Sequence, residues 1–525
     1  CMSPPRDDAM MRLDAALRKY AVPTPPSSPR AAQPLRRRPG VNFLIALSIL
    51  ASLALGALAF VQLRNRGPER VLVIRAGGPD LDVFQAEALS VFLQDHLEAL
   101  GAPPTGLLPA LPDGPRLAEL GERTLVVQPI ARRHGSALGL ELRQAWSGAL
   151  RRGKPAWRGT VIPPGPPAQV FREALQDLPL RLRSSEGLQL VPREPGGFWD
   201  LIRAQGWHRF QPRLGEAQLL TERLLQSEPD CTTGWLVYGD ILYRRLLSDP
   251  KSLSGVRESA ESALASVLKR VPGHPRAAFL LSELHTDSGN QRDALEALRE
   301  AQRHNPRAIA IYAGIAYAGR TSGLLDLARR AADRSNQLLP RIHSGFAAEN
   351  TYLYLGDLAA FEHSLQERPN TPRDATILFY RGYLALARGQ KEKARAWFQQ
   401  AANQETGLGE FRLLSRAFGH IAAGEDLQAL EALQHLERQR TGLRIPDGEF
   451  TFKMAEAHAL LGRREASLDL LTRSFAQGFG CARWYRESPF LLSLRKAPRW
   501  PSLLARVEER QQLFSNRFTP RAFGL

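Results

Sequence analysis

Residues 275–308 read PRAAFLLSELHTDSGNQRDALEALREAQRHNPRA, and residues 309–342 read IAIYAGIAYAGRTSGLLDLARRAADRSNQLLPRI. The prolines near the ends of these two segments, Pro306 and Pro340, stand 34 positions apart. Apolar and small residues recur on the same schedule, and a period of about 34 residues is typical of a solenoid of helix–turn–helix units. The sequence therefore predicts a mainly α protein built from repeated helix pairs.

A third copy of the pattern follows, with Gly382, Ala394, Phe398 and Ala401 in the corresponding places. Small residues let two antiparallel helices approach closely, and a large one fills the groove between them. These residues resemble the tetratricopeptide repeat consensus. Weaker copies begin near Trp199, Trp235, Phe346, Leu408 and Phe450, so we expect about eight units in residues 199–480.

The resemblance implies that the first helices of the units line a concave surface that binds an extended peptide or a partner helix. Aromatic and arginine side chains suit such a surface. The candidate peptide groove comprises Arg276, Phe279, Glu283, Tyr317, Arg320, Phe379 and Tyr383. The competing interpretation is that Phe379 and Tyr383 pack between neighbouring repeats.

Upstream of the repeats, residues 41–63 read VNFLIALSILASLALGALAFVQL and contain no charged residue in 23 positions. A helix of this length spans roughly 34 Å, enough for the hydrocarbon layer of a bilayer, about 30 Å thick. A core helix of this length would show a polar face, and a signal peptide would have a shorter apolar region. We therefore expect a single transmembrane helix.

The segment 1–40 is a basic juxtamembrane tail with eight Lys/Arg residues against three Asp. Basic flanks favour the cytoplasmic side of a membrane. This predicts a single-pass protein of a bacterial inner membrane, with a cytoplasmic N-terminus and a periplasmic C-terminal region. The opening 20 residues also resemble the last helix of a bacterial serine/threonine kinase domain, which indicates a truncated parent chain.

Between the anchor and the repeats, residues 64–183 mix strand and helix patterns. Strands are predicted at 71–74, 124–130, 137–145 and around Val161, with helices at 82–100 and 167–178. The order of Val71–Ile74, Leu125–Pro129, the turn Arg132–Gly135 and Trp157 resembles a TolB-like domain, which implies a small α/β fold. Residues 184–198 are predicted to be a linker, and residues 481–525 an aromatic C-terminal cap on the last repeat.

Several kinds of chemistry find no support in the sequence. The three cysteines match no metal or redox spacing, and Gly77-Gly78 lacks the Lys-Ser/Thr of a phosphate-binding loop. His96 and His134 stand without partners at catalytic or ligand spacing. The net charge of +17 is spread along the chain beside acidic residues, so nucleic acid is not the expected partner. We predict no catalytic residue, cofactor or metal in these residues.

The sequence thus predicts a membrane-anchored protein-interaction or sensory region of a bacterial signalling protein. By resemblance, its parent is a serine/threonine kinase, with an adenylate cyclase or a DNA-binding protein as other possible outputs. The alternative is a self-contained periplasmic scaffold or assembly factor without an output domain.

Overall fold

The computed structural model describes residues 67–111, 121–151, 157–183, 189–210, 213–248, 255–339, 346–366, 375–404, 409–441, 443 and 445–525. These residues belong to one unit, 67–525. The predicted tail 1–40 and the predicted membrane-spanning stretch 41–63 lie outside the described residues. Within the described ranges, no helix combines the length and the hydropathy that crossing a bilayer requires.

Five strands form one mixed sheet in the order β2-β1-β3-β4-β5. The pairs β1–β2 and β1–β3 are parallel, whereas β3–β4 and β4–β5 are antiparallel. The predicted strands are confirmed, and β2 is an addition that the sequence analysis did not find. The strands are β1 (Arg70–Ile74), β2 (Thr105–Leu108), β3 (Thr124–His134), β4 (Ala137–Trp146) and β5 (Val161–Gly165).

Three helices accompany the sheet: α3 (Val83–Ala99), α5 (Ser147–Arg151) and α6 (Pro167–Gln176). The first and third were predicted, and α5 was not. The start of α3 is fixed by a capping box, in which the Asp82 side chain accepts from the Gln85 amide at 2.7 Å and the Gln85 side chain reaches back.

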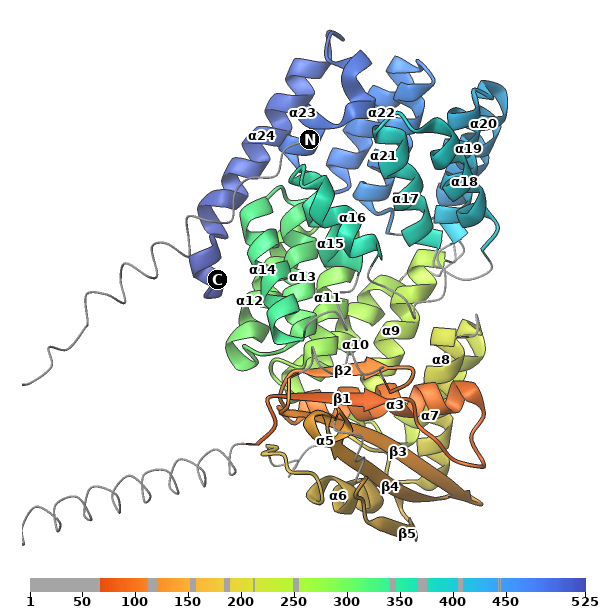
Figure 1. The fold of residues 1–525 in the computed structure, drawn as a ribbon, viewed down its shortest axis with the longest axis vertical. Coiled ribbons are helices and arrows are strands. Elements are labelled where there is room, and N and C mark those ends of the chain that lie inside the picture. Colours follow the sequence, from red (N-terminus) through yellow and green to blue (C-terminus); the bar gives the residue numbers. More distant parts are fainter. Residues whose placement is uncertain are drawn as a thin grey trace, which may run out of the picture. The chain divides into compact units, whose positions relative to one another are not determined.

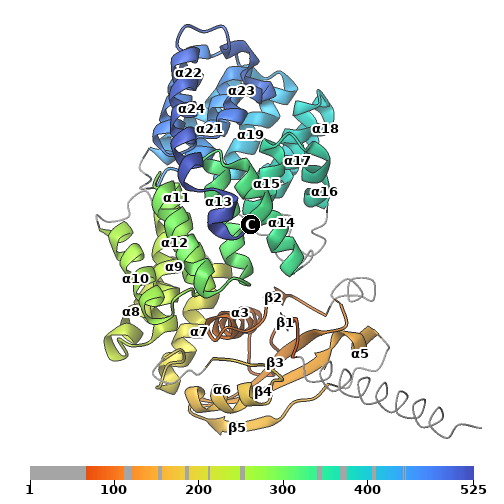
Figure 2. The ribbon, with the colours of Figure 1, turned by 90° about the vertical axis from the view of Figure 1, so that its left-hand side faces the viewer.

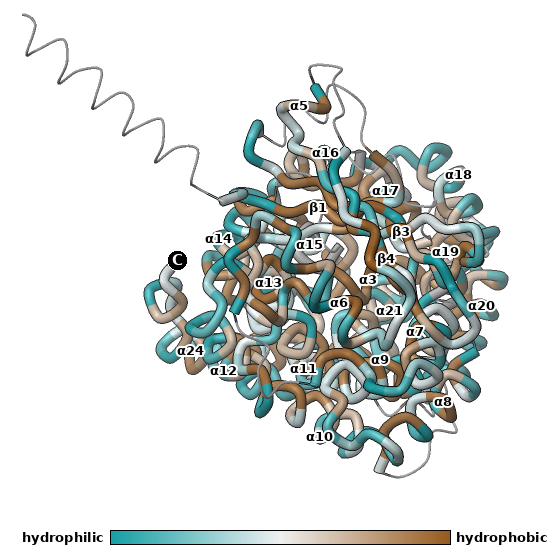
Figure 3. The backbone as a smooth tube through the Cα atoms, turned by 90° about the horizontal axis from the view of Figure 1, so that it is seen from below, coloured by the Kyte–Doolittle hydropathy of each residue, from teal (hydrophilic) through white to brown (hydrophobic). Residues whose placement is uncertain are grey.

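The sheet is buried on both faces, which explains why β1 is apolar throughout. Val71 and Val73 pack in one core with α3, α6 and α7 (Pro195–Phe210). Leu72 and Ile74 point the other way, as alternation along a strand requires, and pack with residues of α12–α14. The sheet is therefore clamped between its own helices and the repeats, an arrangement visible in Figures 1 and 2. Figure 3 colours much of β1 and β3 as hydrophobic.

In the part of the chain that the structure describes, eight successive helix pairs follow, as predicted. Helices within a pair and first helices of neighbouring pairs pack together. The pairs are α7 with α8 (Leu214–Ser227), α9 (Thr232–Ser248) with α10 (Val256–Arg270), α11 (Pro275–Asp287) with α12 (Gln291–His304), α13 (Ile309–Thr321) with α14 (Leu325–Leu338), α15 (Phe346–Tyr354) with α16 (Leu358–Gln366), α17 (Ala375–Ala387) with α18 (Lys391–Ala402), α19 (Gly409–Ala423) with α20 (Asp426–Arg440), and α21 (Gly448–Leu460) with α22 (Arg464–Ala476).

Residues 184–198 were predicted to be a linker, but the part of this segment that the structure describes, residues 189–198, is packed against the rest of the protein. Leu190 and Val191 are buried, and α7 already begins at Pro195. The indole nitrogen of Trp199 donates to the Ser136 carbonyl at 2.9 Å, and Phe198 packs edge-on against Phe92. The first repeat helix therefore completes the core of the α/β part, because α3 leaves an apolar surface that needs cover.

The C-terminal segment consists of α23 (Ala482–Glu487), η2 (Pro489–Leu494), α24 (Trp500–Arg517) and η3 (Pro520–Phe523). Its first half covers the last pairs, with Trp484, Phe490 and Trp500 in their core, as expected of a cap. Its end continues further than predicted, since Phe518 and Phe523 pack with α12–α14. The Gly480 amide also donates to the Thr321 carbonyl at 2.6 Å, so the end of the solenoid is tied to its middle.

Gly77-Gly78 was predicted to be a turn, but Gly77 forms a parallel β-bridge with Ile130 and the turn follows at residues 79–80. The Gly77 amide donates to the Pro129 carbonyl at 2.8 Å, and the Ala131 amide donates to the Gly77 carbonyl at 2.9 Å. A Cβ on Gly78 would meet the Ala131 oxygen at 2.0 Å. The pair is glycine because the chain passes directly over β3.

We predict that Gly382→Ala destabilises the protein although alanine favours helices. A Gly to Ala change within a helix normally stabilises by about 1 kcal/mol. A Cβ on Gly382 of α17 would meet the Phe398 ring at 2.7 Å, so overpacking should reverse the sign and cost about 1–3 kcal/mol. Urea unfolding measures the difference. The matched control is Gly215→Ala, on an open site of α8, which should be neutral or stabilising; equal effects of the two changes would contradict the tight packing.

Candidate functional site

The seven residues predicted to line a peptide groove lie on the first helices of their units. Arg276, Phe279 and Glu283 are on α11, Tyr317 and Arg320 on α13, and Phe379 and Tyr383 on α17. We call the surface formed by α9, α11, α13, α15 and α17 the inner surface. Arg320, Phe379 and Tyr383 are buried on this surface, whereas Arg276, Phe279, Glu283 and Tyr317 are half-buried.

Phe379 and Tyr383 are fully buried. Phe379 sits among Phe398, Phe411 and Phe418, with ring centroids 5.7, 5.4 and 5.4 Å away. Both residues therefore pack between repeats, the competing interpretation of the sequence analysis.

Arg276 belongs to an ion cluster centred on Asp240 at the N-terminal end of the inner surface. Its guanidinium lies 3.0 Å from the Asp240 carboxylate, which Arg244 also reaches at 3.0 Å and Arg209 at 3.4 Å. Burial alone would raise the pKa of Asp240, but the arginines and His208 hold it well below its usual value. Arg276 also lies over the Phe279 ring, 5.7 Å from its centroid.

Next along the surface, Glu283 and Asp287 face tyrosines. Burial raises the pKa of Glu283 to about 7 and that of Asp287 to about 7. The Asp287 carboxylate accepts from Tyr243 at 2.6 Å and from Tyr317 on its other oxygen. The Asp287 carboxyl group is thus held by neutral hydroxyl donors.

Arg320 donates to Glu449 at 2.7 Å, and both side chains are less than one-tenth exposed. Glu449 belongs to α21, far along the chain, and also accepts from Tyr354 and from Asn350. Burial would raise the pKa of Glu449, yet Arg320 lowers it below the usual value. The Arg320 side chain is thus already paired within the protein.

A second buried cluster of α21 holds Tyr383. Its hydroxyl lies 2.8 and 2.9 Å from the two Glu456 oxygens and 2.9 Å from Lys453. Glu456 also accepts from Ser488 at 2.6 Å and from the Trp484 indole at 3.2 Å. Every member lies in the core, so the cluster is a structural network.

Part of the inner surface is therefore covered by the chain itself. Besides these α21 contacts, Ile445 packs in a core with residues of α9, α10 and α11. The occupants, residues 445–456, were not found by the sequence analysis. The signal was available, since Glu449, Lys453 and Glu456 share one face of an otherwise apolar helix and need buried partners.

The remaining sites of possible chemistry offer little. Cys231 and Cys481 are free and buried, and burial raises the pKa of each thiol to about 12. Among the described residues, no group of three or more His, Cys, Asp and Glu side chains is placed to hold a metal ion.

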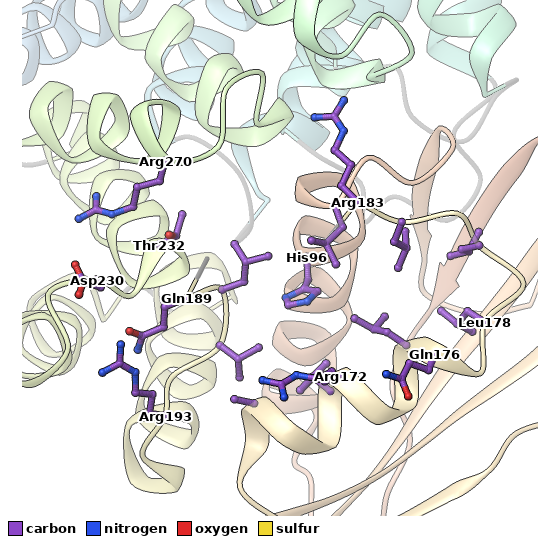
Figure 4. A pocket seen from close by; sticks show the side chains of 18 residues that line it. His96, Arg172, Gln176, Leu178, Arg183, Gln189, Arg193, Asp230, Thr232 and Arg270 are labelled. Carbon is purple, nitrogen blue, oxygen red and sulfur yellow. The ribbon is translucent and has the colours of Figure 1, made fainter. Parts of the chain in front are cut away.

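A cavity of about 940 Å³ opens where α6 meets the first two repeats (Figure 4). We call it the junction cavity. Its walls are apolar and its rim carries four arginines. The lining residues are His96, Leu100, Ala168, Phe171, Arg172, Leu175, Gln176, Leu178, Leu180, Leu182, Arg183, Gln189, Leu190, Val191, Arg193, Asp230, Thr232 and Arg270.

Three side-chain atoms of the lining residues have no hydrogen-bond partner among the described residues and are themselves shielded from solvent: His96 Nδ1, Thr232 Oγ1 and Gln189 Oε1. His96 is 7% exposed and Thr232 is 1% exposed. Burial lowers the pKa of His96 to about 4, so its imidazole is neutral at physiological pH. The sequence analysis treated His96 as a residue without partners and did not find this site.

We predict that Arg320→Met lowers the free energy of unfolding by about 3–5 kcal/mol, because it leaves Glu449 buried without its partner. The control is Arg292→Met, whose side chain is 61% exposed and whose loss should cost less than about 1 kcal/mol. Urea unfolding of both variants measures the contrast. A fully stable Arg320→Met protein would mean that Arg320 is free for a partner after all.

A pH dependence follows from Glu98, which is 8% exposed and whose pKa burial raises to about 8 from 4.5. The unfolded chain releases this proton near pH 4.5 while the folded chain keeps it until pH 8, so stability falls as pH rises through this window. Glu98→Gln cannot ionise.

We expect the stability of Glu98→Gln relative to the unsubstituted protein to increase between pH 5 and pH 8, measured by urea unfolding across that range. Glu258→Gln, at an exposed position of α10, should show a constant difference. Parallel pH profiles for Glu98→Gln and the unsubstituted protein would contradict the assignment.

Comparison with known proteins locates one family match. No curated protein matches the chain. Similar solved structures include the APC/C hetero-tetramer Cut9-Hcn1, which is 14% identical and covers 59% of this chain and 55% of its own, with a TM-score of 0.39. A tetratricopeptide repeat protein from Parabacteroides merdae is 20% identical and covers 40% of this chain and 81% of its own, with a TM-score of 0.33. A third is PilW, a type IV pilus biogenesis factor, which is 16% identical and covers 46% of this chain and 92% of its own, with a TM-score of 0.26. The match thus spans little more than half of the Cut9-Hcn1 chain. The tetratricopeptide repeat family model matches residues 358–407, which comprise α16, α17 and α18, so this segment is similar to the tetratricopeptide repeat.

Proposed function

We propose that this chain is a protein-interaction scaffold, held at a membrane by residues 41–63. The observation that carries the proposal is the run of eight helix pairs together with the tetratricopeptide match at 358–407. Such repeats present large surfaces to protein or peptide partners. Residues 445–456 cover the inner surface at Arg320 and Tyr383, so partner contacts of this scaffold use the half-buried part of that surface or other surfaces of the repeats.

Membrane anchoring rests on the sequence of residues 41–63, which has the length and the hydropathy of a spanning helix. The basic tail before it favours a cytoplasmic N-terminus, with the repeats on the opposite side of a bacterial inner membrane. Cys231 and Cys481 are buried and form no disulfide, so they are compatible with either side of the membrane.

A more specific part of the proposal concerns the signalling domain to which this chain is attached in its parent protein. The resemblance of residues 1–20 to the end of a kinase domain, and of residues 70–178 to a TolB-like domain, supports the sensory part of a serine/threonine kinase. A stand-alone scaffold remains the second candidate, and complex formation without any phosphorylation would favour it.

One experiment tests anchoring and partner binding together. The full chain, carrying a photo-crosslinking amino acid at Leu427, which is 74% exposed, is expressed and fractionated. We expect it in the membrane fraction and crosslinked to discrete partner proteins. Leu55→Arg should reduce insertion, because an arginine at the centre of a spanning helix costs about 2.5–3.5 kcal/mol.

Leu55→Ala is the control and should stay in the membrane. Recovery of the unsubstituted chain in the soluble fraction would overturn anchoring. If no crosslinked partner forms from Leu427, nor from the exposed Leu219 and Leu513, the scaffold proposal itself fails.

A further inference from the structure

Residues 445–447 stand between α20 and α21, yet they contact a distant part of the solenoid. We call them the strap. Ile445 is 1% exposed and packs in one core with residues of α9, α10 and α11. Arg440, the last residue of α20, donates to the Pro446 carbonyl and to Glu410 at 2.6 Å. The strap is therefore seated on the second and third helix pairs, although its own chain joins the seventh pair to the eighth.

The strap ends at Asp447, which caps α21. The Asp447 carboxylate accepts from the amides of Glu449 at 2.9 Å and Phe450 at 3.3 Å. Its backbone has a φ of 46°, and among the described residues it is the one residue other than glycine with a positive φ. Such a conformation is strained and persists only where the surroundings hold it. The closed strap thus depends on its contacts with the repeats.

Asp447 faces Asp287, the last residue of α11, and the charge of Asp287 acts directly on it. Asp287 is 5% exposed and accepts from Tyr243 of α9 at 2.6 Å and from Tyr317 of α13. Two more carboxyl groups face this pair, those of Glu283 and Glu449. The contact between α11 and the strap therefore brings acidic side chains together.

The nearest cations are committed to other partners. Arg440 faces Asp447 but donates to Glu410 and to carbonyl oxygens of the strap. Arg320 pairs with Glu449 at 2.7 Å. Among the described residues, no lysine, arginine or histidine side chain donates to the carboxyl group of Asp287 or of Asp447. Two negative charges at these positions would therefore repel each other across the contact.

The protonation of the pair follows from this arrangement. Burial raises the pKa of Asp287 from 3.8 to about 7, and burial together with the charges of Asp287 and Glu449 raises the pKa of Asp447 from 3.8 to about 8. With the strap open, both carboxyl groups would meet water and ionise near pH 3.8. The closed strap thus keeps protons that the open strap releases, so closure weakens as the pH rises toward about 8.

We propose that residues 445–447 form a proton-dependent strap over the inner surface. While Asp287 and Asp447 hold at least one proton, the strap stays closed with Ile445 in its core. When both carboxyl groups are ionised, they repel each other and the strap lifts, whereas α21 stays in place because Arg320 remains paired with Glu449. This regulation of the inner surface rests on the proposed scaffold function only for what the uncovered surface then binds.

The test measures hydrogen exchange of the full chain in nonionic detergent by mass spectrometry at pH 6, 7 and 8. The informative amides are those of residues 448–451, since the Glu449 and Phe450 amides donate to the Asp447 carboxylate. After correction for the intrinsic exchange rate at each pH, we expect their protection to fall by about tenfold from pH 6 to pH 8. The amides of α18 should keep their protection.

Asp287→Asn together with Asp447→Asn should give the same protection of residues 448–451 at pH 6 and pH 8, because neither amide ionises. Asparagine caps helices as well as aspartate does, so the start of α21 is kept. Asp426→Asn, an exposed change in the first turn of α20, is the matched control and should keep the pH dependence of the unsubstituted chain. Ile445→Ala should lower the protection at pH 6 by about tenfold or more, because it empties the core position of the strap.

Thermal unfolding of each variant separates local opening from loss of fold. Equal protection of residues 448–451 at pH 6 and pH 8 in the unsubstituted chain overturns the proposal, and that result needs no variant. A pH dependence that persists in the double variant, or one that α18 shares, also overturns it.

The outcome is independent of the scaffold proposal. Exchange that does not respond to pH would remove the strap and leave crosslinks from Leu427, Leu219 or Leu513 as evidence for a scaffold. A pH-dependent strap in a chain that forms no crosslinks would remove the scaffold alone.

Discussion

The burial of charged residues of α21 against α13, α15 and α17 is the constraint on which the arrangement of the repeats depends. A carboxylate or an ammonium inside a protein needs a partner at hydrogen-bonding distance, because its hydration is lost. Glu449 finds Arg320 at 2.7 Å, and Lys453 finds Glu456 at 3.1 Å and Tyr383 at 2.9 Å. Helices that must supply these partners cannot slide or open independently, so the polar contacts fix how the last repeats lie against the middle ones.

The sheet imposes a second constraint at the other end. A strand whose consecutive side chains are all apolar must be covered on both faces, and β1 achieves this with α3 and α7 on one side and α13 and α14 on the other. Arg70 strengthens the contact by donating to the Leu338 carbonyl at 2.7 Å, and Arg307 by donating to the Glu69 carbonyl at 3.0 Å. The α/β part is consequently a closing layer of the solenoid rather than a domain on a tether.

These two constraints explain what the sequence could and could not predict. The repeat class, the helix pairs and most strands follow from local periodicity, and Gly382 with Phe398 illustrates how a short-range pattern encodes the contact within one pair. Local periodicity also places the candidate residues Arg276, Tyr317 and Arg320 on the first helices of their units. What covers that surface depends on how the solenoid curves over more than a hundred residues. No local pattern sets the pairing of Arg320 with Glu449, and none brings Gln189 and Thr232 of one cavity to His96 of another helix.

A solenoid whose inner surface is partly covered by its own residues must bind partners differently from an open one. Displacing residues 445–456 would strip Glu449, Lys453 and Glu456 of their buried partners at once, and each unpaired buried charge costs several kcal/mol. A partner segment gains at most a comparable amount from the vacated surface, so exchange is unfavourable. The buried charges of α21 therefore favour partner contacts that leave residues 445–456 in place.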